Sequence, residues 1–115
     1  MDIQQVQKKL AKFAATRDWD RFHSPKNLCM ALVGEVGELT EHFQWLTEEQ
    51  SMKLGADRKR AVGEEIADVL IYTIRLADKL GIDVERAVRR KIKLNAKKYP
   101  ATRARTILGK PARAG

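Results

Sequence analysis

Hydrophobic residues recur every three or four positions along most of the chain, which is the spacing of one face of an α-helix. The first such stripe predicts a helix over residues 3–16. Its members are Ile3, Val6, Leu10 and Phe13. Ser24 followed by Pro25 is a start signal, an N-cap and then proline at the first helical position. It predicts a second helix that runs to about Leu46.

A third helix is predicted after a polar segment. Residues 47–55 end in glycine and are expected to form a loop, after which Asp57 can cap a helix that runs to Leu80 and stops at Gly81. Six hydrophobic residues of this helix should face inward: Val62, Ile66, Val69, Leu70, Ile74 and Ala77.

The fourth helix should begin near Val84 and end near Tyr99, because Pro100 cannot continue it. Strand-like alternation is missing from the sequence, which therefore predicts an all-α fold, a four-helix bundle. Residues 1–100 would form the helical domain and residues 101–115 a basic, flexible tail. A domain of 115 residues buries only about 60–68% of its unfolded surface, so we expect a thin core that self-association completes.

The formal net charge of +8 is concentrated in the last third of the chain. Residues 82–115 carry eleven Lys or Arg against two acidic residues, whereas residues 1–81 carry twelve against thirteen. The basic excess allows one alternative, a nucleic-acid-binding or adaptor protein without catalysis. A separation of carboxylates from cations suits a metal cluster facing a phosphate-binding strip at least as well. Nucleic acid is therefore not the partner that we expect.

The single cysteine, Cys29, cannot form an intrachain disulfide and lies in an apolar run from Leu28 to Val33. We expect it to be a small core residue in a reducing compartment. The same run, the longest in the chain, is far shorter than the ~20 residues that span a bilayer. The N-terminal residues also lack the apolar segment of a signal peptide. The sequence thus predicts a cytoplasmic protein with no membrane partner.

Two pairs of acidic residues interrupt the hydrophobic stripes, Glu35 with Glu38 in the second helix and Glu65 with Asp68 in the third. The members of each pair are three residues apart, so they project in similar directions. Buried carboxylates are costly unless they take up protons, pair with cations or bind metal. Oxygen ligands on two adjacent helices suit a hard divalent ion such as Mg²⁺. Metal binding is the simplest interpretation.

The alternative is that these carboxylates form a solvated helix face with basic partners four residues further on. In the second helix those positions hold Leu39 and His42, and neither is a Lys or Arg. Gly34 and Gly37 each cost a helix about 1 kcal/mol relative to alanine. Close approach of a neighbouring helix or a ligand would explain them.

Several ordered motifs carry a resemblance to a known family. They are Trp19-x-x-Phe22-His23-Ser24-Pro25-Lys26-Asn27, GEVGELTEHFQW from residue 34, EEIADVLIY from residue 64, and Lys91-x-x-x-Asn95. From the first helix to Pro100 the chain resembles the MazG-like all-α nucleoside triphosphate pyrophosphatases, and most closely their dCTP pyrophosphatase branch. That family's signature is E-x-x-E, a gap and E-x-x-D. Here 26 residues, Leu39 through Glu64, separate the two halves.

The resemblance implies an enzyme that attacks the α phosphorus of a (d)NTP and releases pyrophosphate and the (d)NMP. The implied Mg²⁺ ligands are Glu35, Glu38, Glu65 and Asp68. Glu64 could orient or deprotonate the attacking water, although a surface charge is an equal interpretation. The substrate would be dCTP or a modified pyrimidine nucleotide, and the role would be nucleotide-pool house-cleaning. The family also implies a homodimer or homotetramer.

The residues implied to bind substrate are Trp19, His23, Trp45, Tyr72, Lys91 and Asn95. The two on the fourth helix would meet the triphosphate, although periodicity alone makes the lysine a solvated side chain. The three large aromatic rings would surround the base, and without the resemblance the tryptophans could simply close the ends of the bundle. His23 would touch substrate or help to cap the second helix beside Ser24. Members of the family often carry a histidine on the first helix where this chain has Leu10, which leaves base preference open.

Overall fold

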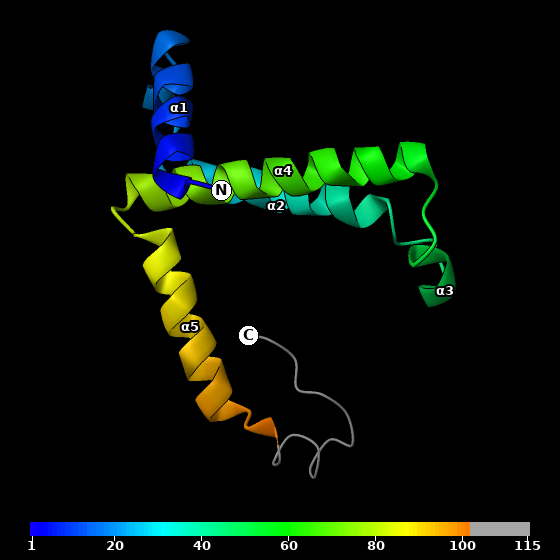
Figure 1. Cartoon of the computed structure of the whole chain (residues 1–115). Coiled ribbons are helices and arrows are strands. Elements are labelled where there is room, and N and C mark those ends of the chain that lie inside the picture. Colours follow the sequence, from blue (N-terminus) through cyan, green and yellow to red (C-terminus); the bar gives the residue numbers. More distant parts are fainter. Residues whose placement is uncertain (102–115) are drawn as a thin grey trace. The chain divides into compact units, whose positions relative to one another are not determined.

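The computed structural model of the protein describes residues 1–101, and every element in that range is helical (Figure 1). The elements are α1 (Ile3–Thr16), the 3₁₀ turn η1 (Asp20–Phe22), α2 (Pro25–Glu41), α3 (Glu48–Ser51), α4 (Ala56–Lys79) and α5 (Val84–Lys98). The predicted all-α class is confirmed. The predicted tail, residues 101–115, lies outside the described residues except for Ala101.

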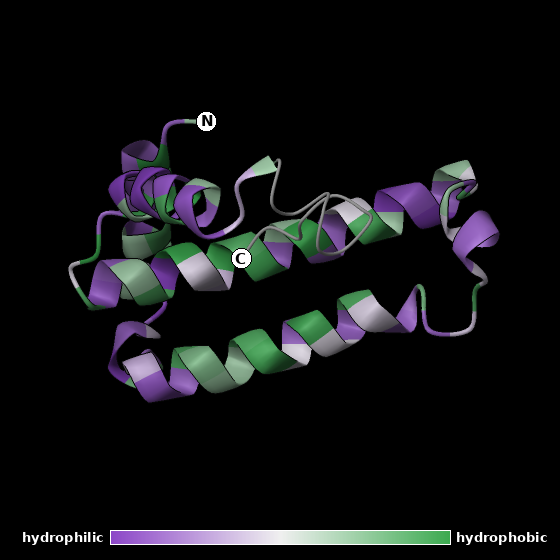
Figure 2. Ribbon diagram, turned by 90° about the horizontal axis from the view of Figure 1, so that it is seen from below, coloured by the Kyte–Doolittle hydropathy of each residue, from purple (hydrophilic) through white to green (hydrophobic). Residues whose placement is uncertain are grey.

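The two longest helices, α2 and α4, lie side by side and run in opposite directions (Figure 1). Hydrophobic residues lie along both of them over much of their length (Figure 2). Leu28 of α2 is only 1% exposed and Ile74 of α4 only 2%. Helix α1 packs against α4, which leaves Ala14 at 2% exposure. Residues 1–81 form one compact unit built on the α2–α4 pair.

Helix α5 belongs to a second unit, which begins at Ile82. Its N-cap is Asp83, whose carboxylate accepts a hydrogen bond of 3.0 Å from the backbone N–H of Arg86. It ends at Lys98, with Tyr99 as the C-cap. Both ends agree with the boundaries that the sequence predicts.

The start signal of α2 and the stop signal of α4 are confirmed. The Ser24 hydroxyl accepts a hydrogen bond of 3.1 Å from the backbone N–H of Asn27, and Pro25 is the first helical residue. Gly81 has a φ of +66° directly after the C-cap of α4. This left-handed conformation carries little penalty for glycine, so the helix stops there.

Helix α2 is shorter than predicted, because it ends at Glu41 and not near Leu46. After Glu41 the backbone forms tighter turns, in which an N–H donates to the carbonyl three residues earlier. The His42 N–H donates to the carbonyl of Leu39 (3.2 Å), and the Leu46 N–H donates to the carbonyl of Phe43 (2.9 Å). Hydrophobic spacing continues through these turns, since side chains three residues apart stay on one face in both geometries.

The segment predicted as a loop contains the short helix α3. Thr47 and Gln50 form a capping box, with the Thr47 hydroxyl accepting from the Gln50 N–H (3.1 Å) and the Gln50 side chain accepting from the Thr47 N–H (3.0 Å). The cap of α4 is Gly55 and not Asp57. Asp57 instead lies in the first turn, where a carboxylate stabilises the helix N-terminus.

The hydrophobic core of the single chain is thin. Its buried hydrophobic residues within the described range are Ala14, Leu28, Val62, Ile74 and Ala77. Cys29, expected in the core, is exposed. Ile66 and Leu70, expected to face inward, are 46% and 45% exposed, because the stripe of α4 is wider than the surface that α1 and α2 cover. Among the described helices, none has the length and apolar character that a membrane span requires.

We predict that Leu28→Ala lowers the free energy of unfolding by about 2–5 kcal/mol, because it opens a cavity between α2 and its neighbours. Lys26→Ala, an exposed change in the same helix, should shift stability by less than about 0.5 kcal/mol. Denaturant titration of both variants measures the difference. Equal losses would show that Leu28 is not a core anchor.

Candidate metal centre and the adjoining pocket

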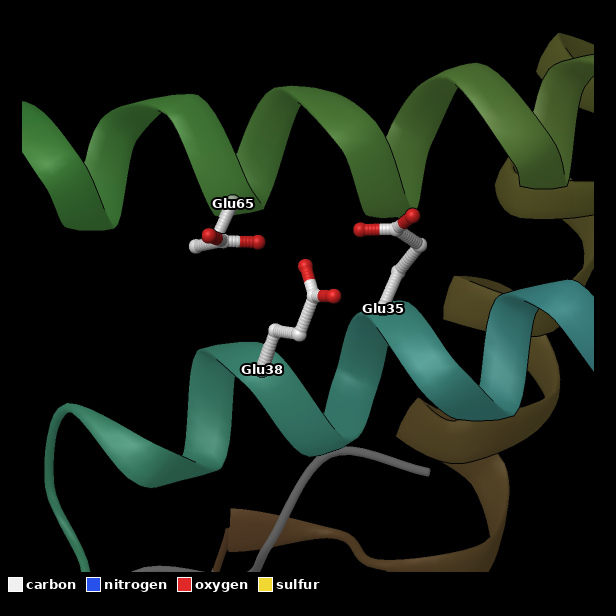
Figure 3. Close-up of side chains that lie close together, drawn as sticks. All are labelled: Glu35, Glu38 and Glu65. Carbon is white, nitrogen blue, oxygen red and sulfur yellow. The ribbon is translucent and has the colours of Figure 1, made fainter.

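Three acidic side chains meet in the space between α2 and α4. Glu35 and Glu38 come from α2 and Glu65 from α4, and their carboxyl groups point toward one another (Figure 3). One oxygen from each lies within 4.8 Å of one oxygen from each of the others. The spacing of three residues in α2 brings two carboxylates to the same helix face, and the antiparallel neighbour supplies the third.

The local environment disfavours negative charge on two of these groups. One oxygen of Glu35 and one of Glu65, Oε2 in each case, is buried without a hydrogen-bond partner among the described residues. Burial raises the pKa of Glu35, and the charges of Glu38 and Asp68 raise it further. Burial also raises the pKa of Glu65, with the neighbouring Glu38 carboxyl as the next cause.

Lys and Arg side chains do not relieve this repulsion, although the charge of His42 acts to lower the pKa of Glu65. Within residues 1–101, the ion pairs of Lys and Arg involve other carboxylates, and none joins Glu35, Glu38, Glu65 or Asp68. A solvated face with basic partners is therefore not what these residues form. Buried oxygens that lack both cations and donors are the donor set that a hard divalent cation binds, and the cluster fits such an ion.

Asp68 lies one turn after Glu65 on α4 but outside the group of three. It is close enough for its charge to raise the pKa of both Glu35 and Glu65. Asp68 also lines the neighbouring pocket, so it connects the acidic cluster to that pocket. Glu64 is exposed and, as the residue before Glu65, points about 100° away from it around the helix axis.

The adjoining pocket has a volume of about 280 Å³ and a mainly apolar lining. Its lining residues are Leu10, Phe13, Ala14, Trp19, His23, Asp68, Ile71, Tyr72 and Arg75. Three of the residues implied to bind substrate, Trp19, His23 and Tyr72, thus meet at one place. The Trp19 ring packs edge to face on Phe13, with centroids 5.5 Å apart.

The other three residues implied to bind substrate lie elsewhere in the chain. Trp45 is 86% exposed in the turns after α2. Lys91 is exposed and Asn95 half-buried on α5, which belongs to the second unit. Their proposed contacts with substrate stay predictions.

An arginine that the sequence interpretation missed lies beside the pocket. Arg75 of α4 is 5% exposed and forms ion pairs with Asp20 of η1 and with Asp78 (3.3 Å), while its Nε–H donates to Nδ1 of His23 (3.3 Å). Lys79 also pairs with Asp20, at 2.7 Å. The hydrogen bond from Lys79 and the two positive charges lower the pKa of Asp20.

A sequence signal for Arg75 did exist. It is seven residues after Asp68 and three after Tyr72, so it falls on the same face of α4, where a cation interrupts an apolar stripe. That is the same kind of signal that singled out Glu35. The ion pairs and the hydrogen bond of Arg75 hold the segment between α1 and α2 against α4.

The fold and the site together define an all-α protein with an acidic cluster between antiparallel helices that fits a metal ion, and with a small apolar pocket beside it. The chain belongs to the MazG-like family, whose model matches residues 31–108. The predicted family resemblance is therefore confirmed.

Individual relatives agree with this assignment. The chain is 46% identical over 106 residues to dCTP pyrophosphatase 1 of Homo sapiens, covering 90% of this chain and 62% of that protein. It is 44% identical over 100 residues to dCTP pyrophosphatase 1 of Bos taurus, covering 85% of this chain and 59% of that protein. The chain thus spans about three fifths of the length of these relatives.

A solved structure shares the fold. The crystal structure of a pyrophosphatase from Archaeoglobus fulgidus superposes with a TM-score of 0.81 at 40% sequence identity. The match covers 87% of this chain and 94% of that one.

We predict that Glu65→Gln stabilises the metal-free protein at neutral pH. The pKa of Glu65 in the folded protein is raised above 4.5, so the folded protein holds the carboxyl proton of Glu65 more tightly than the unfolded chain does. The stability of the wild type therefore falls as pH rises through that raised pKa. Glutamine does not ionise, so the variant does not lose stability in this way. Its gain in stability over the wild type should be full at neutral pH and vanish below about pH 4.5.

Thermal melts in EDTA across this pH range measure the advantage. Glu64→Gln, a change of the adjacent exposed residue, is the matched control and should show little pH-dependent gain. A destabilised Glu65→Gln protein at neutral pH would mean that an unrecognised partner stabilises the charged form of Glu65.

Proposed function

We propose that this protein is a Mg²⁺-dependent nucleoside triphosphate pyrophosphatase that cleaves a (d)NTP between the α and β phosphates. The observation that carries the proposal is the acidic cluster of α2 and α4, in which buried carboxylate oxygens lack any donor or cation among the described residues. Membership of the MazG-like family and similarity to two dCTP pyrophosphatases support the same activity.

Glu35, Glu38 and Glu65 would hold the metal, with Asp68 as a further ligand toward the pocket. When bound, Mg²⁺ supplies positive charge to the triphosphate oxygens and lowers the pKa of a coordinated water. Through the bound ion, the four carboxylates would hold the triphosphate beside the pocket. Pyrophosphate would then be the leaving group, and the (d)NMP would stay in the pocket.

Glu64 is the candidate for orienting or deprotonating the attacking water. Its exposed position allows contact with water, but its direction around α4 differs from that of Glu65. The assignment therefore rests on its place in the EEIAD motif.

The pocket beside Asp68 would receive the base. Its volume of about 280 Å³ lies below the range of about 300–1,000 Å³ typical of sites for drug-sized ligands, so it suits one ring system better than a whole nucleotide. Trp19 and Tyr72 offer aromatic surface and His23 a polar group. We propose dCTP or a modified pyrimidine nucleotide as the substrate, and nucleotide-pool house-cleaning in the cytoplasm as the role.

Self-association, as a homodimer or homotetramer, would complete the molecule. Met30 and Val33 of α2 are 64% and 63% exposed, and Ile66 of α4 is 46% exposed. Apart from its own helix backbone, a Cβ added at Gly34 or Gly37 would meet no atom of the described residues within 4 Å, which leaves room for a second copy or a ligand to approach.

Light scattering at micromolar concentration tests this association. We expect an oligomer, and Val33→Glu, which places a charge in the exposed apolar surface, should shift the population toward the monomer. A wild-type species of 13.1 kDa alone would contradict the proposal.

For the activity, we predict that Asp68→Asn lowers Mg²⁺-dependent pyrophosphate release by more than about 100-fold, which exceeds the usual effect of altering a group that only supports a metal ligand. The metal-free variant should be as stable as the wild type or more stable, because one of several repelling charges is gone. Asp57→Asn, the same change in the first turn of α4, should leave activity within about twofold.

Pyrophosphate release from a panel of (d)NTPs, with and without Mg²⁺, measures the reaction, the cofactor and the base preference together. Retained activity of Asp68→Asn with an unchanged magnesium response would contradict the metal role of Asp68. Absence of pyrophosphate release from every triphosphate would refute the proposed function.

A further inference from the structure

Arg75 and His23 form a side-chain contact between segments that are far apart in sequence. The Nε–H of Arg75 donates to Nδ1 of His23 over 3.3 Å. Arg75 is 5% exposed, and the two remaining nitrogens of its guanidinium are held by Asp78 and Asp20. The guanidinium is therefore fixed in orientation as well as position.

The backbone around His23 is fixed too. The His23 N–H donates to the carbonyl of Asp20 (3.0 Å), and the Asn27 side chain donates to the carbonyl of Phe22 (2.9 Å). These contacts hold the segment between η1 and α2 while Arg75 holds the ring. His23 can thus keep one ring orientation at the wall of the pocket.

This contact decides which ring nitrogen carries the proton. An arginine nitrogen only donates hydrogen bonds and does not lose its proton in proteins, so the atom that faces it must accept. Nδ1 of His23 is consequently unprotonated, and the proton of the neutral ring is on Nε2. Among the described residues, Nε2 has no hydrogen-bond partner, so its N–H is available to a ligand.

The geometry points to Arg75 as a positioning residue that fixes His23 in its Nε2–H form, so that the pocket presents one constant donor to the base of a nucleotide. The inference rests on the proposed function. The chemistry that this donor recognises is a hydrogen-bond acceptor on the base, either a carbonyl oxygen or an unprotonated ring nitrogen. Base selectivity would thus depend on a residue that need not touch the base itself.

The surrounding charges keep the ring neutral. Burial is the largest cause that lowers the pKa of His23, and the positive charge of Arg75 is the next. Lys79 acts in the same direction and Asp20 in the opposite one. A neutral ring has one donor and one acceptor, so fixing the acceptor fixes the donor. A bound base without an acceptor would cover this N–H and leave it unpaired, which is how a polar site rejects the wrong ligand.

Nitrogen NMR of the wild-type protein tests the tautomer directly. A long-range ¹H–¹⁵N correlation spectrum distinguishes a protonated ring nitrogen from a bare one, and the chain has only two histidines. The His42→Gln variant assigns the signals of His23. We expect a protonated Nε2 and a bare Nδ1 at neutral pH. A protonated Nδ1 would overturn the inference, and this measurement needs no change at Arg75.

Enzyme kinetics test the consequence for selectivity. The quantity to compare is kcat/KM for the preferred (d)NTP divided by kcat/KM for a deoxyribose triphosphate that lacks a base. We expect Arg75→Met to lower this ratio roughly three- to tenfold, the factor that one hydrogen bond contributes. Lys79→Met, which removes the other cation from Asp20 and leaves the Arg75–His23 hydrogen bond in place, should leave the ratio unchanged.

A double variant separates positioning from simple damage. The side-chain amide of glutamine carries its N–H near the place of Nε2 and has no tautomer to fix. His23→Gln in the Arg75→Met background should therefore restore most of the lost ratio. An Arg75→Met enzyme that loses the same factor on both substrates, and is not restored by His23→Gln, would show a structural role only and overturn the inference.

The two proposals fail in different ways. A wild-type enzyme that hydrolyses (d)NTPs but carries the proton on Nδ1 of His23 would refute this inference alone. A protein that releases no pyrophosphate from any triphosphate would refute the proposed function, whatever the NMR spectrum shows.

Discussion

Electrostatic repulsion between carboxylates of α2 and α4 is the constraint on which the rest of the molecule depends. The same helix pair that buries Leu28 and Ile74 also brings Glu35, Glu38 and Glu65 together, with Asp68 one turn away. Packing the helices therefore places negative charges in a partly buried space, where each raises the energy of the others. The raised pKa values of Glu35 and Glu65 express this conflict. A divalent cation bound among these carboxylates would offset their charge without loss of the fold.

The other features follow from what a metal-bound triphosphate would need. An apolar pocket adjoins the cluster at Asp68 and would hold the base, while the cluster would hold the phosphates through a bound ion. The pocket wall includes the non-α-helical segment around η1, and side-chain contacts must hold this segment in place. Arg75 holds this segment in place by joining Asp20 and His23 to the C-terminal part of α4. One face of α4 thus carries both the acidic and the basic elements of the site.

Much of this arrangement could be predicted from the sequence. Helical spacing and the signals at Ser24 and Gly81 located the main helices, because capping is a local property. The spacing of Glu35 with Glu38 and Glu65 with Asp68 placed the carboxylates on matching faces. Two things escaped. The end of α2 was predicted too far along the chain, because turns with hydrogen bonds between residues three apart preserve the hydrophobic spacing. Cys29 was placed in the core, since an apolar run does not reveal which of its sides has a neighbour.

The long-range contacts could not be derived from local patterns. Asp20 and Arg75 are 55 residues apart, and nothing in either segment specifies that they meet. Their pairing depends on the antiparallel packing of α2 and α4 together with the path of the chain through η1. A buried cation on an apolar stripe was a usable hint, but its partner is defined only by the fold.

The central claim is that the carboxylates of α2 and α4 form a metal site. Anomalous X-ray diffraction from crystals of the full chain soaked in Mn²⁺, a stand-in for Mg²⁺ with the same preference for oxygen ligands, tests it most directly. The account predicts an anomalous peak among the carboxyl groups of Glu35, Glu38 and Glu65, with Asp68 at its edge. Well-ordered carboxylates without a peak, or carboxylates paired with lysine or arginine of another copy, would contradict it.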